Sequence, residues 1–214
     1  MAITTRPATP DDAPFLAWVI QTAARSHLEK GIWDLAFPGP DNQRLEILEI
    51  YAATDLVHLG HWSRFLIAEI DGERAAALSA YENSKHGGER INQGMVEALS
   101  RLGWTEEQML EIPDRIEPFK SAGYVNHDGR WIVEWVATLP EFRRRGLIHR
   151  LLIEILERGR EQGFREAQIG YLLGNIPAKN AYENVGFRWV KNYCNPDFEK
   201  AFGTPGIASM HLNL

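Results

Sequence analysis

The sequence predicts an α/β fold with a mixed sheet, on three observations. A β-branched and aromatic run at 131–139 is followed by a turn and then by helical periodicity over 147–162. A second apolar run at 167–173 completes a strand–helix–strand unit, whose two strands we expect to be parallel. The Asp71-Gly72 pair joins the strand-like runs on either side of it into an antiparallel hairpin through a type I′ turn.

The remaining elements follow from local periodicity and capping residues. Residues 3–6 predict a first strand, and Thr9 or Asp11 can cap the helix that follows. Residues 27–61 are irregular apart from a helix expected at 42–53. Later elements are expected as strands at 64–70 and 74–81, a helix at 175–185 stopped by Gly186, a strand at 187–193, a loop with Pro196 and Pro205, and a final strand at 207–214.

Residues 82–130 form a long segment between the third and fourth strands. After a flexible stretch, the pattern predicts two helices, at about 91–102 and 105–119, the second beginning with a capping sequence at Thr105. Long segments with their own secondary structure are usually lids or interaction elements. A packing decoration or a dimer contact explains this segment equally well.

The turn before the helix at 147–162 has the composition of an anion site. The first turn of a helix offers unpaired N–H groups and the positive end of the helix dipole. Arg143, Arg144 and Arg145 add positive charge, and Gly146 allows a ligand to approach the backbone closely. The turn could therefore hold a diphosphate, although most turns of this kind are only helix starts with a solvated basic face.

Two motifs resemble those of the GCN5-related N-acetyltransferases, the GNAT family. Its pyrophosphate signature is Gln or Arg, two residues, Gly, one residue, then Gly or Ala. Residues 143–148 read Arg-Arg-Arg-Gly-Leu-Ile, so Ile148 stands where the family has a small residue. The second family motif is matched by Asn175, Ala178, Tyr182, Gly186 and Phe187. Residues 3–13 also resemble the family's opening strand and capped helix.

The resemblance implies a GNAT fold for residues 1–214 as one N-acetyltransferase domain. This fold has a central mixed, mostly antiparallel sheet of about seven strands flanked by helices, here with a helical insertion at 82–130. The fourth and fifth strands are expected to splay, opening a slot for the pantetheine arm of acetyl-CoA, and no metal is expected. The residues assigned to acetyl-CoA are Val136, Ala137, Thr138, Arg143, Arg144, Arg145, Gly146, Leu147, Ile148, His149, Asn175, Ala178 and Tyr182.

Acetyl transfer to an amine needs a base, an oxyanion donor and an acid for the departing thiolate. The resemblance assigns the backbone N–H of Val136 to the oxyanion and the Tyr182 phenol to the thiolate. Glu134, a lone carboxylate in an apolar strand, is the candidate base because partial desolvation raises its pKa. Asn175 is expected to bind the pantetheine arm.

Each of these roles has an alternative. Tyr182 could simply pack on the sheet, Glu134 could face outward or pair with an arginine, and Asn175 could form an Asx turn. His58 and His61 have a spacing that can share a metal, but the sequence offers no third ligand nearby. The seven tryptophans are expected mainly in the core, although Trp135 could also line the acceptor pocket.

Composition limits the class of protein. A chain of 214 residues can bury a substantial core, and its net charge of −6 disfavours a nucleic-acid binder and favours cationic acceptors. Cys194 is the only cysteine, which favours a reducing compartment. The sequence has neither a signal-peptide pattern nor a membrane-length apolar run. We therefore expect a soluble, cytoplasmic protein without nucleic-acid or membrane partners, and a homodimer through the C-terminal strands is compatible with the sequence.

Together these features predict an N-acetyltransferase that uses acetyl-CoA as co-substrate. The acceptor is expected to be a primary amine, favoured to be a small molecule, acetylated by direct transfer in a ternary complex. Cys194 follows the sixth strand, so no cysteine is placed to form an acyl-enzyme. A non-catalytic acyl-CoA-binding or regulatory module on the same fold stays open as an alternative, as do O-acyl transfer and a longer acyl donor. The non-catalytic module would be favoured if Glu134 and Tyr182 both pointed away from the slot.

Overall fold

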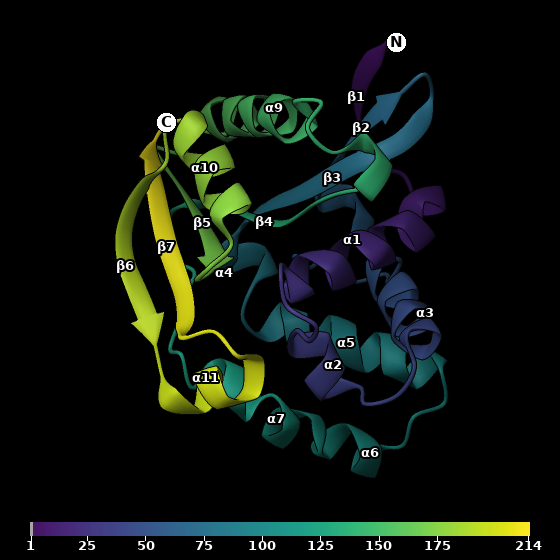
Figure 1. Cartoon of the computed structure of the whole chain (residues 1–214). Helices are drawn as coiled ribbons and strands as arrows, with labels where there is room; N and C mark the ends of the chain where they lie inside the picture. Colours follow the sequence, from purple (N-terminus) through teal and green to yellow (C-terminus); the bar gives the residue numbers. More distant parts are fainter. Residues whose placement is uncertain (1) are drawn as a thin grey trace.

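The computed structural model of the chain describes residues 2–214, which form one seven-stranded sheet with helices on both faces (Figure 1). The strands are β1 (Ile3–Pro7), β2 (Phe65–Ile70), β3 (Glu73–Glu82), β4 (Trp131–Thr138), β5 (Glu166–Leu172), β6 (Arg188–Cys194) and β7 (Gly206–Asn213). The helices are α1 (Ala13–Arg25), α2 (Ile32–Ala36), α3 (Asp41–Ala52), α4 (Asn83–His86), α5 (Glu89–Arg101), α6 (Glu106–Leu110), α7 (Ile112–Arg115), α8 (Glu117–Lys120), α9 (Leu147–Glu161), α10 (Ile176–Asn184) and α11 (Pro196–Phe202). No helix among these residues is both long enough and apolar enough to span a bilayer.

The sheet has the strand order β1-β2-β3-β4-β5-β7-β6. Only β4 and β5 pair in parallel, and every other neighbouring pair is antiparallel. The parallel pair is the one predicted from the strand–helix–strand pattern, because a helix crossover returns the chain in the same direction. The turn at Asp71 and Gly72 has positive φ at both residues, as a type I′ hairpin requires. The predicted mixed, mostly antiparallel sheet flanked by helices is confirmed.

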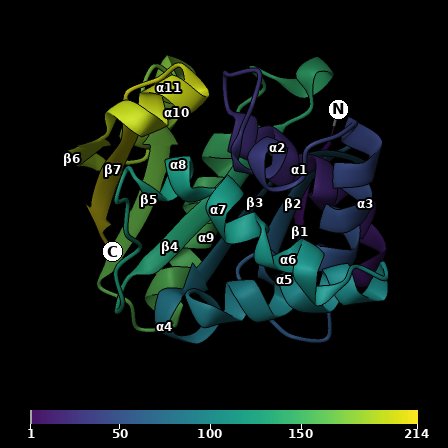
Figure 2. The same cartoon turned by 90° about the horizontal axis from the view of Figure 1, so that it is seen from below.

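Alternate residues of the central strands face two separate cores. In β2, Phe65 and Ile67 pack with the apolar sides of α1, α3 and α5, whereas Leu66 and Ala68 pack on the side of α9 and α10. This alternation follows from the two-residue period of a strand. The views in Figures 1 and 2 place α9 on the opposite side of the sheet from α1 and α3.

A bulge interrupts β4 near its centre. Ser79 of β3 lies opposite Glu134 and Ala77 lies opposite Ala137, so Trp135 and Val136 together face a single β3 residue. Trp135 has a φ of 53°, which is rare for a non-glycine residue. The parallel pairing with β5 stops at Val133, although β4 continues to Thr138. The ends of β4 and β5 therefore diverge immediately after the bulge.

Four segments differ from the sequence expectations. In the stretch expected to be flexible at the start of the 82–130 segment, Asn83–His86 form the short helix α4. The helix expected at 105–119 is divided into α6, α7 and α8, because Pro113 and Pro118 lack the N–H that a continuous helix needs. Figure 2 shows these short helices following one another along one side of the molecule. The expected loop after β6 contains α11, whose buried Phe198 and Phe202 pack beside the insertion. The irregular region at 27–61 also contains the short helix α2.

Candidate active site

A cleft of about 1100 Å³ opens where β4 and β5 diverge. Its walls come from β4, the β4–α9 turn, β5, α10, the α1–α3 region and the insertion. The candidate residues from the sequence all line this cleft, namely Glu134, Val136, Ala137, Thr138, Arg143, Arg144, Arg145, Gly146, Leu147, Ile148, His149, Asn175, Ala178 and Tyr182. One cavity therefore brings together residues from two separate sequence motifs, while their individual roles stay predictions.

The arginine-rich turn presents the start of α9 to the cleft. Gly146 is the N-cap residue and has a φ of 76°, a left-handed conformation that glycine adopts without strain. The N–H of Arg150 donates to the carbonyl of Gly146 over 3.1 Å, which is the first hydrogen bond of the helix. The backbone N–H groups just before Arg150 therefore lie ahead of the first helical hydrogen bond and can point to a ligand. The Arg145 guanidinium lies over the Phe142 ring. This arrangement suits an anionic ligand at the helix start.

Glu134 lies just before the bulge, and its side chain lines the cleft. Burial of the carboxyl raises the pKa of Glu134 to about 7, while hydrogen bonds from Asn126 and Tyr81 oppose part of that rise. Asn126 Nδ2 lies 2.5 Å from Glu134 Oε1 and 2.8 Å from the Tyr81 hydroxyl. Glu134 can therefore accept a proton near neutral pH, which suits a general base. No arginine pairs with Glu134 among the described residues, and its side chain does not face away from the cleft.

Tyr182, on α10, is buried and also lines the cleft. Its ring contacts those of Tyr171 and Phe187 edge to face. Burial raises the pKa of the Tyr182 phenol well above its ordinary value, so the hydroxyl keeps its proton at neutral pH. Tyr182 thus packs on the sheet, which is the alternative stated for this residue. Its side chain, with a protonated hydroxyl, also lines the cavity.

Asn175 caps α10 at the end of β5. Its Oδ1 accepts the N–H of Ala178 over 3.1 Å, and its Nδ2 donates to Ser26 Oγ over 2.6 Å. The capping role corresponds to the Asx-type alternative for this residue. The bond to Ser26 also ties the end of α1 to α10 across the cleft, and contact between Asn175 and a pantetheine arm stays a prediction.

An aromatic chamber that the sequence did not predict forms one end of this cavity. Trp33, Tyr51 and Trp135 line it, and the Trp33 ring lies 6.0 Å from the Trp135 ring and 6.1 Å from the Tyr51 ring, between centroids. Asn126 and Tyr124 come from the insertion. Trp135 was expected as a pocket candidate from its place in β4, whereas the others lie in segments without a motif. Trp189 lies outside the core and is 57% exposed.

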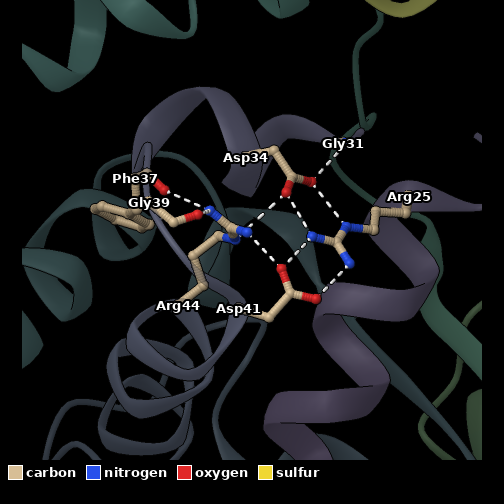
Figure 3. Close-up of polar contacts among 7 residues, drawn as sticks. All are labelled: Arg25, Gly31, Asp34, Phe37, Gly39, Asp41 and Arg44. Carbon is tan, nitrogen blue, oxygen red and sulfur yellow. Dashed lines mark hydrogen bonds and ion pairs between the residues drawn. The ribbon is translucent and has the colours of Figure 1, made fainter. Parts of the chain in front are cut away.

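An ion-pair network holds the helix that carries Trp33 (Figure 3). Arg25 binds both Asp34 and Asp41, with its shortest contact to Asp34 Oδ1 at 2.6 Å, and Arg44 also pairs with both carboxylates. The backbone groups that join this network are Gly31 N–H, which donates to Asp34, and the carbonyls of Phe37 and Gly39, which accept from Arg44. Because Trp33 directly precedes Asp34, the network fixes the wall of the aromatic chamber.

The two spaced histidines are part of the structural core. His58 is fully buried, its Nε2 lies 2.9 Å from Thr54 Oγ1, and its ring stacks on Tyr51. Burial is the main cause that lowers the pKa of His58, to about 3, so it is neutral at physiological pH. Across residues 2–214, no group of three or more His, Cys, Asp or Glu side chains is arranged to hold a metal ion.

Comparisons with known proteins agree with the fold. A model of the acetyltransferase (GNAT) family matches residues 30–187, which confirms the resemblance predicted from the motifs. An acetyltransferase structure has 17% identity and a TM-score of 0.70 over 98% of both chains. An N-acetyltransferase from Staphylococcus aureus Mu50 has 17% identity and a TM-score of 0.68, covering 98% of this chain and 100% of that one.

A third structure was solved with a bound cofactor. It is a putative acetyltransferase from Salmonella typhimurium with its cofactor acetyl-CoA, 16% identical with a TM-score of 0.57, over 100% of this chain and 95% of that one. At these identities the solved structures establish the fold alone. No curated protein matches the chain by sequence.

Proposed function

Because the chain belongs to the acetyltransferase (GNAT) family, we propose that it transfers an acetyl group from acetyl-CoA to a small primary amine, directly within a ternary complex. The observation that supports this most strongly is Glu134. This carboxyl group lines the cleft beside a strand bulge, with its pKa raised to about 7 by burial. A base with a pKa near the working pH is the most effective one for removing a proton from an amine.

The cleft fits a CoA thioester at two places. The start of α9, with Arg143, Arg144 and Gly146 in its turn, offers backbone amides and positive charge for a diphosphate. Beyond Val133, the edge of β4 no longer pairs with β5, so an extended amide-containing arm can take the place of the missing neighbour. Bound there, acetyl-CoA supplies an activated acetyl group.

The residues of the bulge and of α10 can then serve the transfer. After the ammonium group has lost one proton to solvent, the amine nitrogen attacks the thioester carbon and gives its second proton to Glu134. The carbon–sulfur bond breaks as the tetrahedral intermediate collapses. The N–H of Val136, in the bulge, is proposed to donate to the developing oxyanion. The Tyr182 hydroxyl gives its proton to the departing thiolate, and the proton held by Glu134 leaves to solvent. Solvent proton exchange then restores Tyr182.

Two observations favour a direct transfer enzyme over the alternatives. Glu134 and Tyr182 both line the cleft, whereas a non-catalytic module would not need either side chain there. Cys194 is exposed on β6 and does not line the cleft, so a cysteine acyl-enzyme has no support. We further propose that residues 1–214 act as a single domain, because Asn126 of the insertion bonds directly to Glu134.

Calorimetric titration with acetyl-CoA tests the cofactor site. Wild-type protein is expected to bind with micromolar affinity, and Arg144→Glu to bind at least tenfold more weakly because its new carboxylate repels the diphosphate. Arg165→Glu makes the same charge change in an exposed residue beyond the other end of α9 and is the matched control. Thiol release with a panel of amines then tests transfer. No binding by folded wild-type protein would overturn the proposal.

A further inference from the structure

The aromatic chamber contains buried polar atoms without a partner. Trp33 Nε1, Tyr51 Oη and Trp135 Nε1 have no hydrogen-bond partner within residues 2–214. Trp33 is 8% exposed and Tyr51 is fully buried, yet all three residues line the cleft. A buried donor left unpaired destabilises the folded state, because it has lost its hydrogen bonds to water without gaining others. Asn126 Oδ1, an acceptor on the same cleft, is also without a partner in this part of the chain. Four such groups in one chamber indicate that a ligand supplies the missing partners, with an acceptor for the indole and phenol groups and a donor for Asn126.

The chemistry of these groups defines what the ligand must offer. An indole N–H is a donor only, and a phenol hydroxyl can donate as well as accept. Because the Trp33 ring is next to both the Tyr51 and the Trp135 rings, the three groups belong to one recognition surface. The complementary ligand group is a hydrogen-bond acceptor, such as an amide carbonyl or a hydroxyl oxygen.

The charge of the chamber determines whether the hydrogen-bond acceptor of the ligand is neutral or a carboxylate. Glu134 contributes a carboxylate close enough to the Tyr51 and Tyr124 phenols to help raise the pKa of both, after burial as the main cause. In the described chain, the lysines and arginines that line the cleft are only Arg143, Arg144 and Arg145, in the β4–α9 turn. A ligand carboxylate would meet like charge from Glu134 without a chamber cation, whereas an ammonium group would be attracted by Glu134 and by the aromatic faces.

We propose that the acceptor substrate is a small amine that also carries an uncharged hydrogen-bond acceptor and no carboxylate. The amino group lies toward Glu134 and the neutral acceptor binds the N–H and O–H groups of Trp33, Tyr51 and Trp135. Because these atoms are closed to solvent in this structure, binding requires the three rings to turn toward the ligand. This assignment rests on the proposed acetyl transfer and specifies the substrate class of the same site. An α-amino amide and an amino alcohol are the simplest members of this class.

Two matched ligand series test the assignment. One is leucinamide, leucine and isoamylamine, and the other is phenylalaninamide, phenylalanine and phenethylamine. Within each series the carbon skeleton is kept while the neutral acceptor is present, replaced by a carboxylate or absent. Binding to the protein is measured by calorimetry with and without CoA, so the readout does not depend on turnover. The amide is expected to bind at least fivefold more tightly than both other members in at least one series.

Three variants connect that preference to the chamber. Trp33→Phe, Tyr51→Phe and Trp135→Phe each remove one donor and keep an aromatic ring. Each is expected to weaken amide binding about five- to tenfold more than it weakens binding of the simple amine, which keeps only the contact with the aromatic face. Trp189→Phe, at an exposed tryptophan on β6, is the control and should change neither. Thermal melting confirms that each variant is folded.

The outcomes separate this inference from the proposed function. Tighter binding of the free amino acid, equal binding within each series, or no binding in either series would overturn the substrate assignment. If acetyl-CoA binds and amines are acetylated in those cases, the acetyltransferase function stands without it. If the amide preference is present but acetyl-CoA does not bind, the chamber assignment survives as a ligand site and the acetyltransferase proposal fails.

Discussion

The amide of Asn126 donates to Glu134 Oε1 over 2.5 Å and thereby joins the insertion to the bulged strand β4. The same amide nitrogen donates to Tyr81 Oη over 2.8 Å, and the Tyr81 hydroxyl also bonds to Glu134. These bonds favour the ionised carboxylate, while its burial favours the protonated form. The insertion between β3 and β4 thus contributes to the balance that keeps the pKa of Glu134 near neutrality.

Replacing the amide should change that balance in a defined direction. Asn126→Leu removes a donor that stabilises the carboxylate, so the pKa of Glu134 should rise above its present value of about 7. The acidic limb of the kcat/KM profile should therefore move to higher pH. Asn92→Leu, at an exposed position on α5, is the control within the insertion. If the acidic limb of the kcat/KM profile stays at the same pH in Asn126→Leu, the insertion does not influence the pKa of Glu134.

The two glycines that bracket α9 allow cofactor binding to be separated from stability. Gly146 and Gly163 have φ values of 76° and 85°, and an added Cβ would have no atom within 4 Å at either position. Each change to alanine should cost about 1–2 kcal/mol of unfolding free energy, because a left-handed conformation strains any L-residue. Only Gly146→Ala should also weaken acetyl-CoA binding. Denaturant unfolding and calorimetry on both variants check this, and equal binding by the two would contradict the assignment of the turn.

The network around α2 should depend more on its buried acid than on its exposed one. Asp34 has a side chain 8% exposed and pairs with two arginines, whereas the Asp41 side chain is 55% exposed. Asp34→Ala removes the buried carboxylate that binds Arg25 through two hydrogen bonds and accepts the Gly31 N–H, and should lose about 3–5 kcal/mol of unfolding free energy. Asp41→Ala should lose about 0–1 kcal/mol. Urea unfolding of both variants measures the difference, and equal losses would show that burial does not control this network.

The same network predicts a pH dependence of stability. Burial works to raise the pKa of Asp34, but the Arg25 guanidinium and the Gly31 N–H together lower this pKa below its ordinary value. A depressed carboxyl pKa contributes stability above the unfolded-state pKa, and that contribution is lost as pH falls through the folded-state value. Wild-type protein should therefore lose more stability than Asp34→Ala between neutral and strongly acidic pH. Equal losses of unfolding free energy by wild type and Asp34→Ala over this pH range would contradict the role of Asp34.

Tyr182→Phe separates the two roles of that side chain. Phenylalanine keeps the ring that packs on Tyr171 and Phe187, and removes only the hydroxyl. If the phenol protonates the thiolate, kcat should fall about 100-fold with little change in acetyl-CoA affinity. Tyr193→Phe, on β6 outside the cleft, is the control. An unchanged kcat for Tyr182→Phe would leave the residue with packing alone.

The parts of the site that could be predicted from sequence are those carried by contiguous motifs. The turn at 143–148 and the segment at 175–182 each follow the end of a strand and contain the start of a helix, so local chemistry identifies them. Trp33, Tyr51 and Asn126 come from α2, α3 and a loop of the insertion, and only tertiary packing brings them to Glu134. No spacing of residues along the sequence indicates that these side chains lie close together.

The secondary-structure differences have a similar cause. The five-residue helix α2 is too short to show periodicity, and it is stabilised by the ion pairs of Asp34 with distant arginines. The helix α11 begins with Pro196, a residue that also suits a loop, and it is stabilised by burial of Phe198. In contrast, Pro113 and Pro118 were visible in the sequence and were sufficient to predict a divided helix.

The most direct test of the central claim is the pH dependence of kcat/KM for wild-type protein and Glu134→Gln with an amine that the enzyme acetylates. For wild type, kcat/KM should rise with pH through an apparent pKa near 7, because Glu134 must be ionised to accept the proton. Glu134→Gln should lose about 100- to 10,000-fold in kcat, keep its acetyl-CoA affinity and lack this limb. A variant with wild-type kcat and the same limb would contradict the role of Glu134 as the base.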